Sequence, residues 1–188
     1  MKQTPSPVAA PAAASRYDRT TIVLHWLTAV LVLVLFALAM LWDFMPHDVH
    51  KQMQSLHISL GIVLAAVLLL RLVWRATRGR RLPMAVEGLQ GKAAKAMHYL
   101  LYLLLVAQVI LGFAWRWAQA EVFQFFDLFP LRFADVRNGP LAHLFGNLHD
   151  VIGWTIVILA GLHAAVALVH HHVLKDGVLK RMMGGGRP

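Results

Sequence analysis

Four long apolar stretches, separated by polar segments, constrain the fold of this chain more than any other feature. They cover about residues 20–42, 56–74, 97–118 and 148–174 of 188. A helix needs about 20 residues to cross the roughly 30 Å hydrocarbon layer of a bilayer. Because lipid offers backbone amides no hydrogen-bonding partner, each stretch is expected to form a helix. The sequence therefore predicts an all-α membrane protein built as a four-transmembrane-helix bundle.

Composition supports the membrane class and excludes several others. Hydrophobic residues make up 59% of the chain and charged residues only 14%, which is unusual for a soluble domain. The formal net charge is +9, yet the basic residues flank the apolar stretches and form no patch typical of nucleic-acid binding. The absence of cysteine excludes disulfides, iron–sulfur clusters and covalently attached haem, and leaves the 11 histidines as candidate metal ligands.

The distribution of Lys and Arg predicts the orientation of the helices. Four spans put both termini on one side of the membrane, and 14 of the 18 Lys and Arg residues lie in the two terminal segments and the connection between the second and third spans. Basic residues are retained on the cytoplasmic side of short loops. Both termini are therefore expected to be cytoplasmic.

The remaining segments divide into tails, a membrane domain and one long outer loop. Residues 1–15 are rich in Ala, Pro and Ser and are expected to be a disordered tail, and residues 184–188 a flexible end. Residues 16–183 form the membrane domain. The Phe-rich loop over residues 119–147 is expected to lie as an amphipathic segment at the outer interface. The alternative is that it caps a buried cofactor.

Histidines recur inside the apolar stretches, where polar side chains are costly and call for a reason. His25 and His98 lie near the inner ends of the first and third spans, whereas His57 and His149 lie near the outer ends of the second and fourth. His163 follows His149 by 14 residues, which is roughly 21 Å along a helix and only some 40° around it. One face of the fourth span thus presents a histidine near each membrane surface.

These depths predict two places where imidazoles meet across the bundle, as haem iron requires. His57 pairs with His149 at the outer level, and His163 pairs with either His25 or His98 at the inner level. A flat macrocycle needs small residues one turn from its ligand, which favours His25, since Tyr102 follows His98. The small residues at that spacing are Ala29, Gly61, Gly153 and Ala167. The alternative is a haem-free bundle in which the histidines only bond helices together.

Three segments resemble the bacterial cytochrome b561 family. They are residues 22–26 (Ile-Val-Leu-His-Trp), residues 56–61 (Leu-His-Ile-Ser-Leu-Gly) and residues 161–176, which run from Gly-Leu-His-Ala-Ala to Lys-Asp. The resemblance extends over about residues 17–183. It implies a multi-pass protein of the bacterial inner membrane with two non-covalent b haems. Carried over residue by residue, His25 and His163 ligate the inner haem iron, and His57 and His149 the outer one.

The resemblance also implies an activity. The expected function is electron transfer from the outer face to the quinone pool, with superoxide oxidised and ubiquinone reduced. His98, His170 and Lys175 are the candidate residues of the quinone site, because quinone reduction consumes protons. Arg71 and Arg16 are candidate haem-propionate contacts, although Arg71 could instead reach the headgroups. The expected partners are the lipid bilayer, quinone, and superoxide or a periplasmic redox partner. The alternative function is a cytochrome b subunit that docks to a hydrogenase- or dehydrogenase-type partner and passes electrons to or from it.

Overall fold

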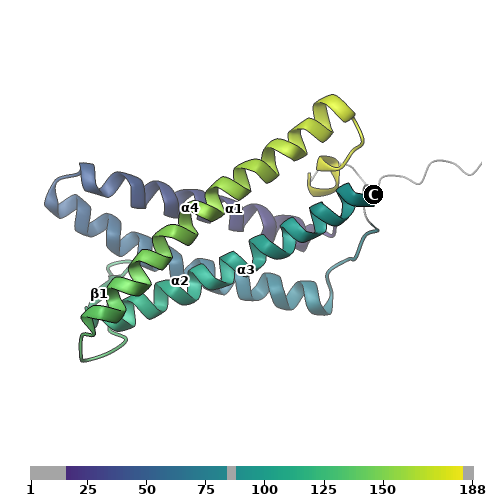
Figure 1. The fold of residues 1–188 in the computed structure, drawn as a ribbon. Helices are drawn as coiled ribbons and strands as arrows, with labels where there is room; N and C mark the ends of the chain where they lie inside the picture. Colours follow the sequence, from purple (N-terminus) through teal and green to yellow (C-terminus); the bar gives the residue numbers. More distant parts are fainter. Residues whose placement is uncertain (1–15, 84–87, 184–188) are drawn as a thin grey trace, which may run out of the picture.

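Four long helices make up most of the computed structural model, which describes residues 16–83 and 88–183 (Figure 1). The expected tail and flexible end, residues 1–15 and 184–188, lie outside the described residues. The helices are α1 (Arg19–Leu41), α2 (His47–Thr77), α3 (Gly88–Gln119) and α4 (Gly139–Val169). Each is long and apolar enough to cross a membrane, which confirms the predicted helical membrane fold.

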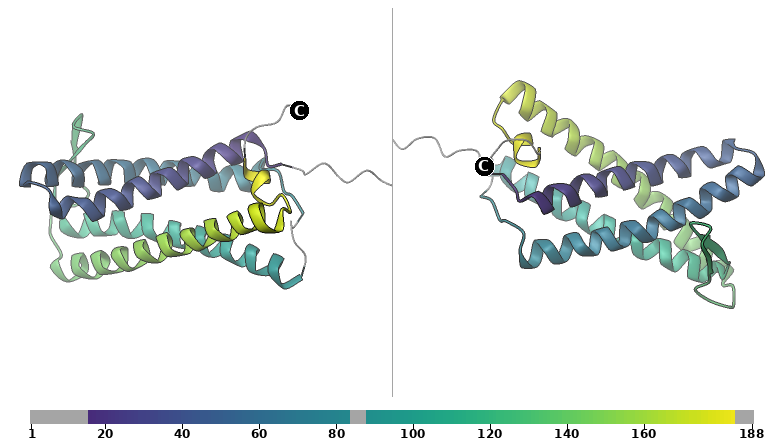
Figure 2. Two further views of the ribbon diagram at one scale, coloured as in Figure 1. Left: turned by 90° about the horizontal axis from the view of Figure 1, so that it is seen from above. Right: turned by 180° about the vertical axis from the view of Figure 1, so that it is seen from behind.

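The helices pack as two antiparallel pairs that face each other. Helix α1 lies along α2 and α3 lies along α4, while α2 also meets α3 and α1 meets α4. The start of α1 and the short helical turn η3 (Leu179–Met182) lie at the same end of the bundle (Figure 2). There the amide of Tyr17 donates a hydrogen bond of 3.2 Å to the carbonyl of Arg181. The two described ends of the chain therefore lie on one side.

Three helices extend beyond the stretches predicted from hydropathy. Helices α2, α3 and α4 each begin nine residues before the predicted spans, at His47, Gly88 and Gly139. An apolar run predicts only the part of a helix that lies in the hydrocarbon layer. Polar turns can continue the same backbone hydrogen bonds beyond that layer. At its other end α4 continues into η2, a π-helical turn over His170–Leu174. Such turns are rare and are often found at functional sites.

The core between the helices is small, and most large apolar side chains point outward. One buried cluster joins α1 and α2 through Leu31, Leu35 and Leu64, and a second joins α2, α3 and α4 through Leu68, Leu105 and Ile156. The outward-facing side chains include Leu33, Leu69, Leu103 and Val151, each at least 60% exposed. Patches of this extent are unusual on a soluble protein. They are the surface that a bilayer would cover.

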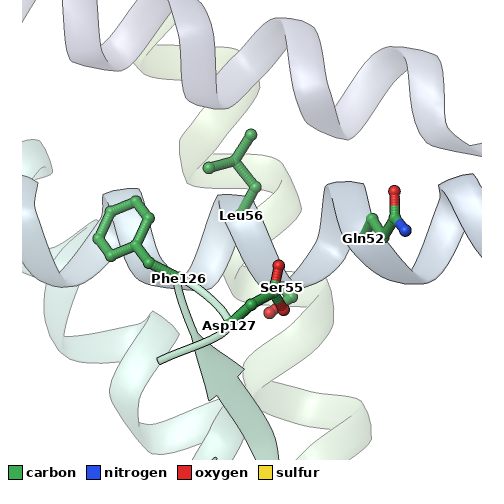
Figure 3. Close-up of a pocket in the computed structure, with 5 residues that line it drawn as sticks. All are labelled: Gln52, Ser55, Leu56, Phe126 and Asp127. Carbon is green, nitrogen blue, oxygen red and sulfur yellow. The ribbon is translucent and has the colours of Figure 1, made fainter. Parts of the chain in front are cut away.

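A two-stranded hairpin, β1 (Phe123–Phe125) and β2 (Phe129–Leu131), occupies the long outer loop and lies against α2. The Ser55 hydroxyl donates to the Gln124 carbonyl at 2.5 Å, and the Phe126 amide donates to the hydroxyl of Ser59, which is fully buried, at 3.1 Å. Figure 3 shows the hairpin turn beside α2, where the two enclose a hollow of about 270 Å³. The loop is therefore fastened to the bundle.

Asp18 fastens α1 to the end of α2. Its carboxylate caps α1 by accepting from the amide of Thr21 at 2.9 Å, and it also accepts from the Trp74 indole and the Arg80 amide. Partial burial acts to raise the pKa of Asp18, but the hydrogen bonds outweigh it and hold that pKa well below its usual range. Asp18 therefore stays ionised in the folded protein at any physiological pH.

Replacing Asp18 is expected to weaken the fold in a pH-dependent way. Asp18→Ala should lower the free energy of unfolding in detergent by about 1 kcal/mol near neutral pH, the usual loss for a helix cap. Because the pKa is lower in the folded than in the unfolded chain, this contribution is complete above about pH 4 and is lost as the pH falls further. Chemical unfolding followed by circular dichroism at several pH values measures it. Asp135→Ala, which removes an exposed surface pair with Arg132, is the control; equal effects of the two variants would contradict the assignment.

Candidate functional site

Two histidines from diagonal helices face each other near the end of the bundle that carries the β1–β2 hairpin. This end is called outer, and the opposite end inner, after the orientation expected from the sequence. The rings of His57 on α2 and His149 on α4 have centroids 6.3 Å apart, at an interplanar angle of 70°. An imidazole nitrogen binds a metal at about 2.0 Å, so a metal between two opposed imidazoles separates the ring centroids by roughly 6 Å. The spacing of this pair suits iron bound between the two rings.

The surroundings of this outer pair fix the His57 ring. Nδ1 of His57 lies 2.9 Å from the Leu35 carbonyl on α1, so Nδ1 carries the proton and donates it. Nε2 is then left as the acceptor, which is the arrangement usual for metal-ligating histidines. The indole of Trp42 stands edge-on to this ring at 5.4 Å. At Gly61, one turn along α2, an added methyl group would meet nothing within 4 Å, so there is open space beside the ligand.

Helix α3 leaves room for the other ring of the outer pair. A Cβ added at Gly112 would lie 3.3 Å from Cε1 of His149, a tight contact, so the glycine lets this ring lie close against α3. Trp115 of the same helix packs on the ring with a centroid separation of 5.7 Å. Gln108, one turn before Gly112, lies beside Gly153 of α4. A Cβ added at Gly153 would lie 3.2 Å from the side-chain amide nitrogen of Gln108. Small residues thus set how closely α3 and α4 meet around His149.

The inner level gathers three histidines and an arginine. His163 of α4 stands edge-on to His98 of α3 with ring centroids 5.2 Å apart. Arg71 of α2 donates from Nη2 to Nδ1 of His25 on α1 at 2.9 Å. All four side chains are close enough to interact electrostatically. The structure therefore brings His163 together with both of its candidate partners, His25 and His98.

Arg71 is held by three helices at the inner level. Besides its bond to His25, its guanidinium lies over the ring of Tyr102 on α3, 4.8 Å from the centroid. Its Nε is buried and has no hydrogen-bond partner among the described residues. A buried guanidinium with an unused donor is suited to an acidic group such as a carboxylate. Tyr102, which follows His98 by one turn, has its ring covered by the Arg71 guanidinium.

The residues predicted at the quinone site separate at the end of α4. His170, in the π-helical turn, is paired through Nδ1 with the carboxylate of Asp176. That carboxylate also accepts from the Val178 amide at 3.1 Å. Burial acts to raise the pKa of Asp176, but these bonds lower it below its usual value. Lys175 instead lines a neighbouring hollow with His171 and His172.

Arg16 also lies at this inner end, directly before Tyr17. The amide of Tyr17 donates a hydrogen bond to the carbonyl of Arg181, which fixes the chain beside Arg16 at this end. Arg16 also interacts with another residue. The candidate propionate contacts Arg71 and Arg16 therefore lie toward the same end of the bundle as His25 and His163.

The histidines meet as pairs, which bears on the kind of metal they suit. Within residues 16–83 and 88–183, no group of three or more His, Asp or Glu side chains is arranged to hold a metal ion. A bare transition-metal ion usually takes three or four protein ligands. Haem iron carries four nitrogens of its own and needs only two axial ligands. Paired imidazoles with open space beside Gly61 are compatible with haem iron, and the fold is that of a multi-pass helical membrane protein.

Comparison with known proteins identifies the family. The family model described as prokaryotic cytochrome b561 matches residues 16–185, and the chain belongs to this family of membrane electron-transport cytochromes, which implies haem b. It is 37% identical to cytochrome b561 homolog 2 of Escherichia coli, covering 90% of this chain and 92% of that protein. It is 30% identical to the probable superoxide oxidase CybB of Yersinia pestis, over 89% and 96%. Cytochrome b562 of Cereibacter sphaeroides is 29% identical, over 89% and 94%.

Several residues around these histidines were not predicted from the sequence. Gly112 and Gln108 of α3, the carbonyl of Leu35 and the carboxylate of Asp176 all contact a candidate histidine or its neighbour. Hydropathy and histidine depth give no information about them, because each acts from a different helix or turn. The only signal in the sequence is the pair of polar or small residues, Gln108 and Gly112, within an otherwise apolar span.

Proposed function

We propose that the chain is a di-haem b cytochrome of the bacterial inner membrane, with both termini cytoplasmic, that oxidises superoxide at its outer face and reduces ubiquinone near its inner face. The observation that carries this proposal is the meeting of histidines at two depths. The outer rings of His57 and His149 are 6.3 Å apart, and His163 lies at the inner level with His25 and His98. The similarity to a probable superoxide oxidase supports the choice of electron donor.

His57 and His149 would hold the iron of the outer haem, and His25 and His163 that of the inner one. Haem b supplies reversible one-electron storage when it is bound. The Leu35 carbonyl orients the His57 ring and keeps the proton on Nδ1, which leaves Nε2 as the donor to iron. Tyr102, which contacts the Arg71 guanidinium, occupies the turn beside His98 and supports His25 as the ligand. Nε2 of His25 would bind iron only when Arg71 leaves Nδ1, because an imidazole that accepts a hydrogen bond at Nδ1 carries its proton on Nε2.

The electron balance requires two superoxide anions for each ubiquinone. Each superoxide gives up one electron and leaves as dioxygen, and two electrons with two protons convert ubiquinone to ubiquinol. The levels of His149 and His163 are roughly 21 Å apart along α4, so one electron carrier at each level divides the crossing into short steps. His98 and His170 are the proposed proton donors for quinone. The carboxylate of Asp176 holds the ring of His170 through Nδ1.

Arg71 is the proposed cation for a propionate of the inner haem. Its buried Nε has no hydrogen-bond partner among the described residues, and its bonds to His25 and Tyr102 hold it between three helices. An acidic group here would satisfy a donor that is otherwise costly to bury. The Arg16 side chain, further toward the inner end, is the second candidate for the same role.

A bulky residue at position 112 is expected to remove the outer haem. Gly112→Val places methyl groups where a Cβ alone already lies 3.3 Å from the His149 ring, so the ring must turn away from His57. The expected loss is one of two haems, measured as the ratio of haem to protein after purification. Gly161→Val on α4 is the matched control, because an added Cβ there meets nothing within 4 Å. Equal haem content in the two variants would contradict the outer assignment.

Stopped-flow mixing of the purified, quinone-loaded protein with superoxide tests the activity. The proposal expects haem reduction to outpace the spontaneous dismutation of superoxide, followed by formation of ubiquinol. Reduction no faster than dismutation would rule out the superoxide role and leave haem binding untouched.

A carrier subunit is the second candidate function. The hairpin region exposes apolar side chains at the outer end of the bundle, with Leu128 74% and Val136 82% exposed. Such residues suit contact with a protein partner. Co-purification of a large redox subunit with the tagged chain, together with slow reaction with superoxide, is the result that this alternative expects.

A further inference from the structure

The chain after α4 folds back to form a basic hollow of about 290 Å³. Its lining residues, which define the basic hollow, are His171, His172, Lys175, Gly177 and Lys180. The fold-back depends on two left-handed residues, Lys175 at φ 53° and Gly177 at φ 78°. They reverse the chain so that η3 returns toward the end of α4, as Figure 2 shows for the yellow segment.

Contacts with three other parts of the chain hold η3 in this position. The indole of Trp26 on α1 donates to the Met182 carbonyl at 2.9 Å. The Arg181 guanidinium donates to the carbonyl of Pro83, in the connection that follows α2, at 2.8 Å. The Arg181 carbonyl accepts from the amide of Tyr17. The basic hollow is therefore built by long-range contacts and does not depend on local turn preference alone.

The positive charge of the basic hollow is not cancelled from within. Two ammonium groups and two imidazoles line it, and none of its five lining residues is acidic. Asp176 lies between Lys175 and Gly177 in the sequence, but its carboxylate is engaged by His170 and by the Val178 amide. An anion entering the hollow would thus meet the ammonium groups of Lys175 and Lys180, while the adjacent carboxylate of Asp176 is already hydrogen-bonded.

The depth of the basic hollow matches the level of lipid headgroups. The membrane-spanning part of α4 and its π-helical extension ends at Leu174, one residue before Lys175. Val173 and Leu174 are 70% and 56% exposed, so an apolar surface leads directly to the hollow. A phosphate held by Lys175 and Lys180 could keep its acyl chains against these residues. Basic pockets at the cytoplasmic ends of membrane helices bind anionic headgroups in this way.

We propose that the basic hollow is a binding site for the phosphate group of an anionic phospholipid of the inner leaflet. Lys175 and Lys180 supply the charge, and His171 and His172 supply ring N–H donors. The proposal gives Lys175 a role outside the quinone site and uses three residues that take no part in the proposed electron path. It stands or falls independently of the superoxide activity, because neither haem nor quinone contributes to the site.

Native mass spectrometry of the full chain in detergent tests this site. The protein is titrated with phosphatidylglycerol, with zwitterionic phosphatidylcholine, and with phosphatidylglycerol in the presence of inorganic phosphate. Removing two surface cations in K175Q/K180Q is expected to weaken phosphatidylglycerol binding roughly 30-fold. The matched control is K92Q/K95Q, which removes two exposed lysines of α3 at the same end of the bundle and should leave binding unchanged. K175R/K180R should retain binding, since arginine keeps the charge and its donors suit phosphate.

Three results would overturn the proposal. Equal weakening by both glutamine pairs would show a diffuse surface attraction, and equal affinity for the two lipids would show that the net negative charge of the headgroup is not recognised. Displacement of phosphatidylglycerol by millimolar inorganic phosphate would show a site for soluble phosphate instead. Circular dichroism of each variant checks that the helices are intact, so that a loss of binding reports on the site.

Discussion

His57→Ala and His149→Ala are each expected to yield a protein with one haem b per chain, where the parent is expected to hold two. A non-covalent haem depends on both axial imidazoles to stay in a membrane bundle, and either substitution removes one of them. Even the loss of an orienting bond around a metal-ligating histidine typically lowers affinity 10–100-fold, and the loss of the ligand itself should cost more. In His149→Ala the Leu35 carbonyl still orients the His57 ring. This variant should therefore retain at most weak binding of the outer haem through His57 alone.

Haem content per protein, with a redox titration of what remains, measures this effect. The parent should titrate as two components and each variant as one, since the inner haem lies roughly 21 Å away along α4. His143→Ala is the control, because His143 is an exposed histidine of α4 less than two turns from His149. A variant of either outer histidine that retains two haems would refute the outer pair, and loss from His143→Ala would make the effect non-specific.

The second large effect is expected at the inner level, where His163→Ala should remove the inner haem and with it the reduction of quinone. His163 is the one inner histidine common to both ligand arrangements, since His25 and His98 are the alternatives for its partner. His25→Ala is expected to have the same effect on haem content. His98→Ala is expected to keep both haems and to slow ubiquinol formation, because His98 is assigned to proton delivery.

The pair of variants His25→Ala and His98→Ala separates the two arrangements directly. If His98→Ala empties the inner site while His25→Ala retains haem, the edge-on contact of His98 with His163 at 5.2 Å marks the true ligand pair. The bond of His25 to Arg71 would then be the structural contact. Arg71→Gln distinguishes these cases further, since it should disturb the inner haem more when His25 is its ligand.

The sequence predicts the architecture well because membrane spans are set by a local property. About 20 apolar residues suffice to identify each helix, and the four predicted spans coincide with α1 to α4 apart from polar turns at their ends. The depth of a histidine is equally local, since it follows from counting residues along one helix. For this reason the sequence alone predicts that His57 and His149 face each other, and their rings lie 6.3 Å apart.

Contacts made between elements were beyond the reach of sequence reasoning. The hairpin at β1 and β2 depends on the hydroxyls of Ser55 and Ser59, which belong to α2, a helix far earlier in the chain. The Asp18 cap could have been anticipated from its position before an apolar run, but not its bonds to Trp74 and Arg80. The choice between His25 and His98 likewise depends on Arg71 and Tyr102, whose positions follow from how three helices pack.

The most direct test is to count the haems in the purified parent protein and determine their axial ligands. We expect two haem b groups per chain, both low-spin with two imidazole ligands, and neither should bind carbon monoxide because both axial positions of each iron are filled. A single haem, or an iron that is high-spin and binds carbon monoxide, would contradict the pairing of histidines as iron ligands at two depths.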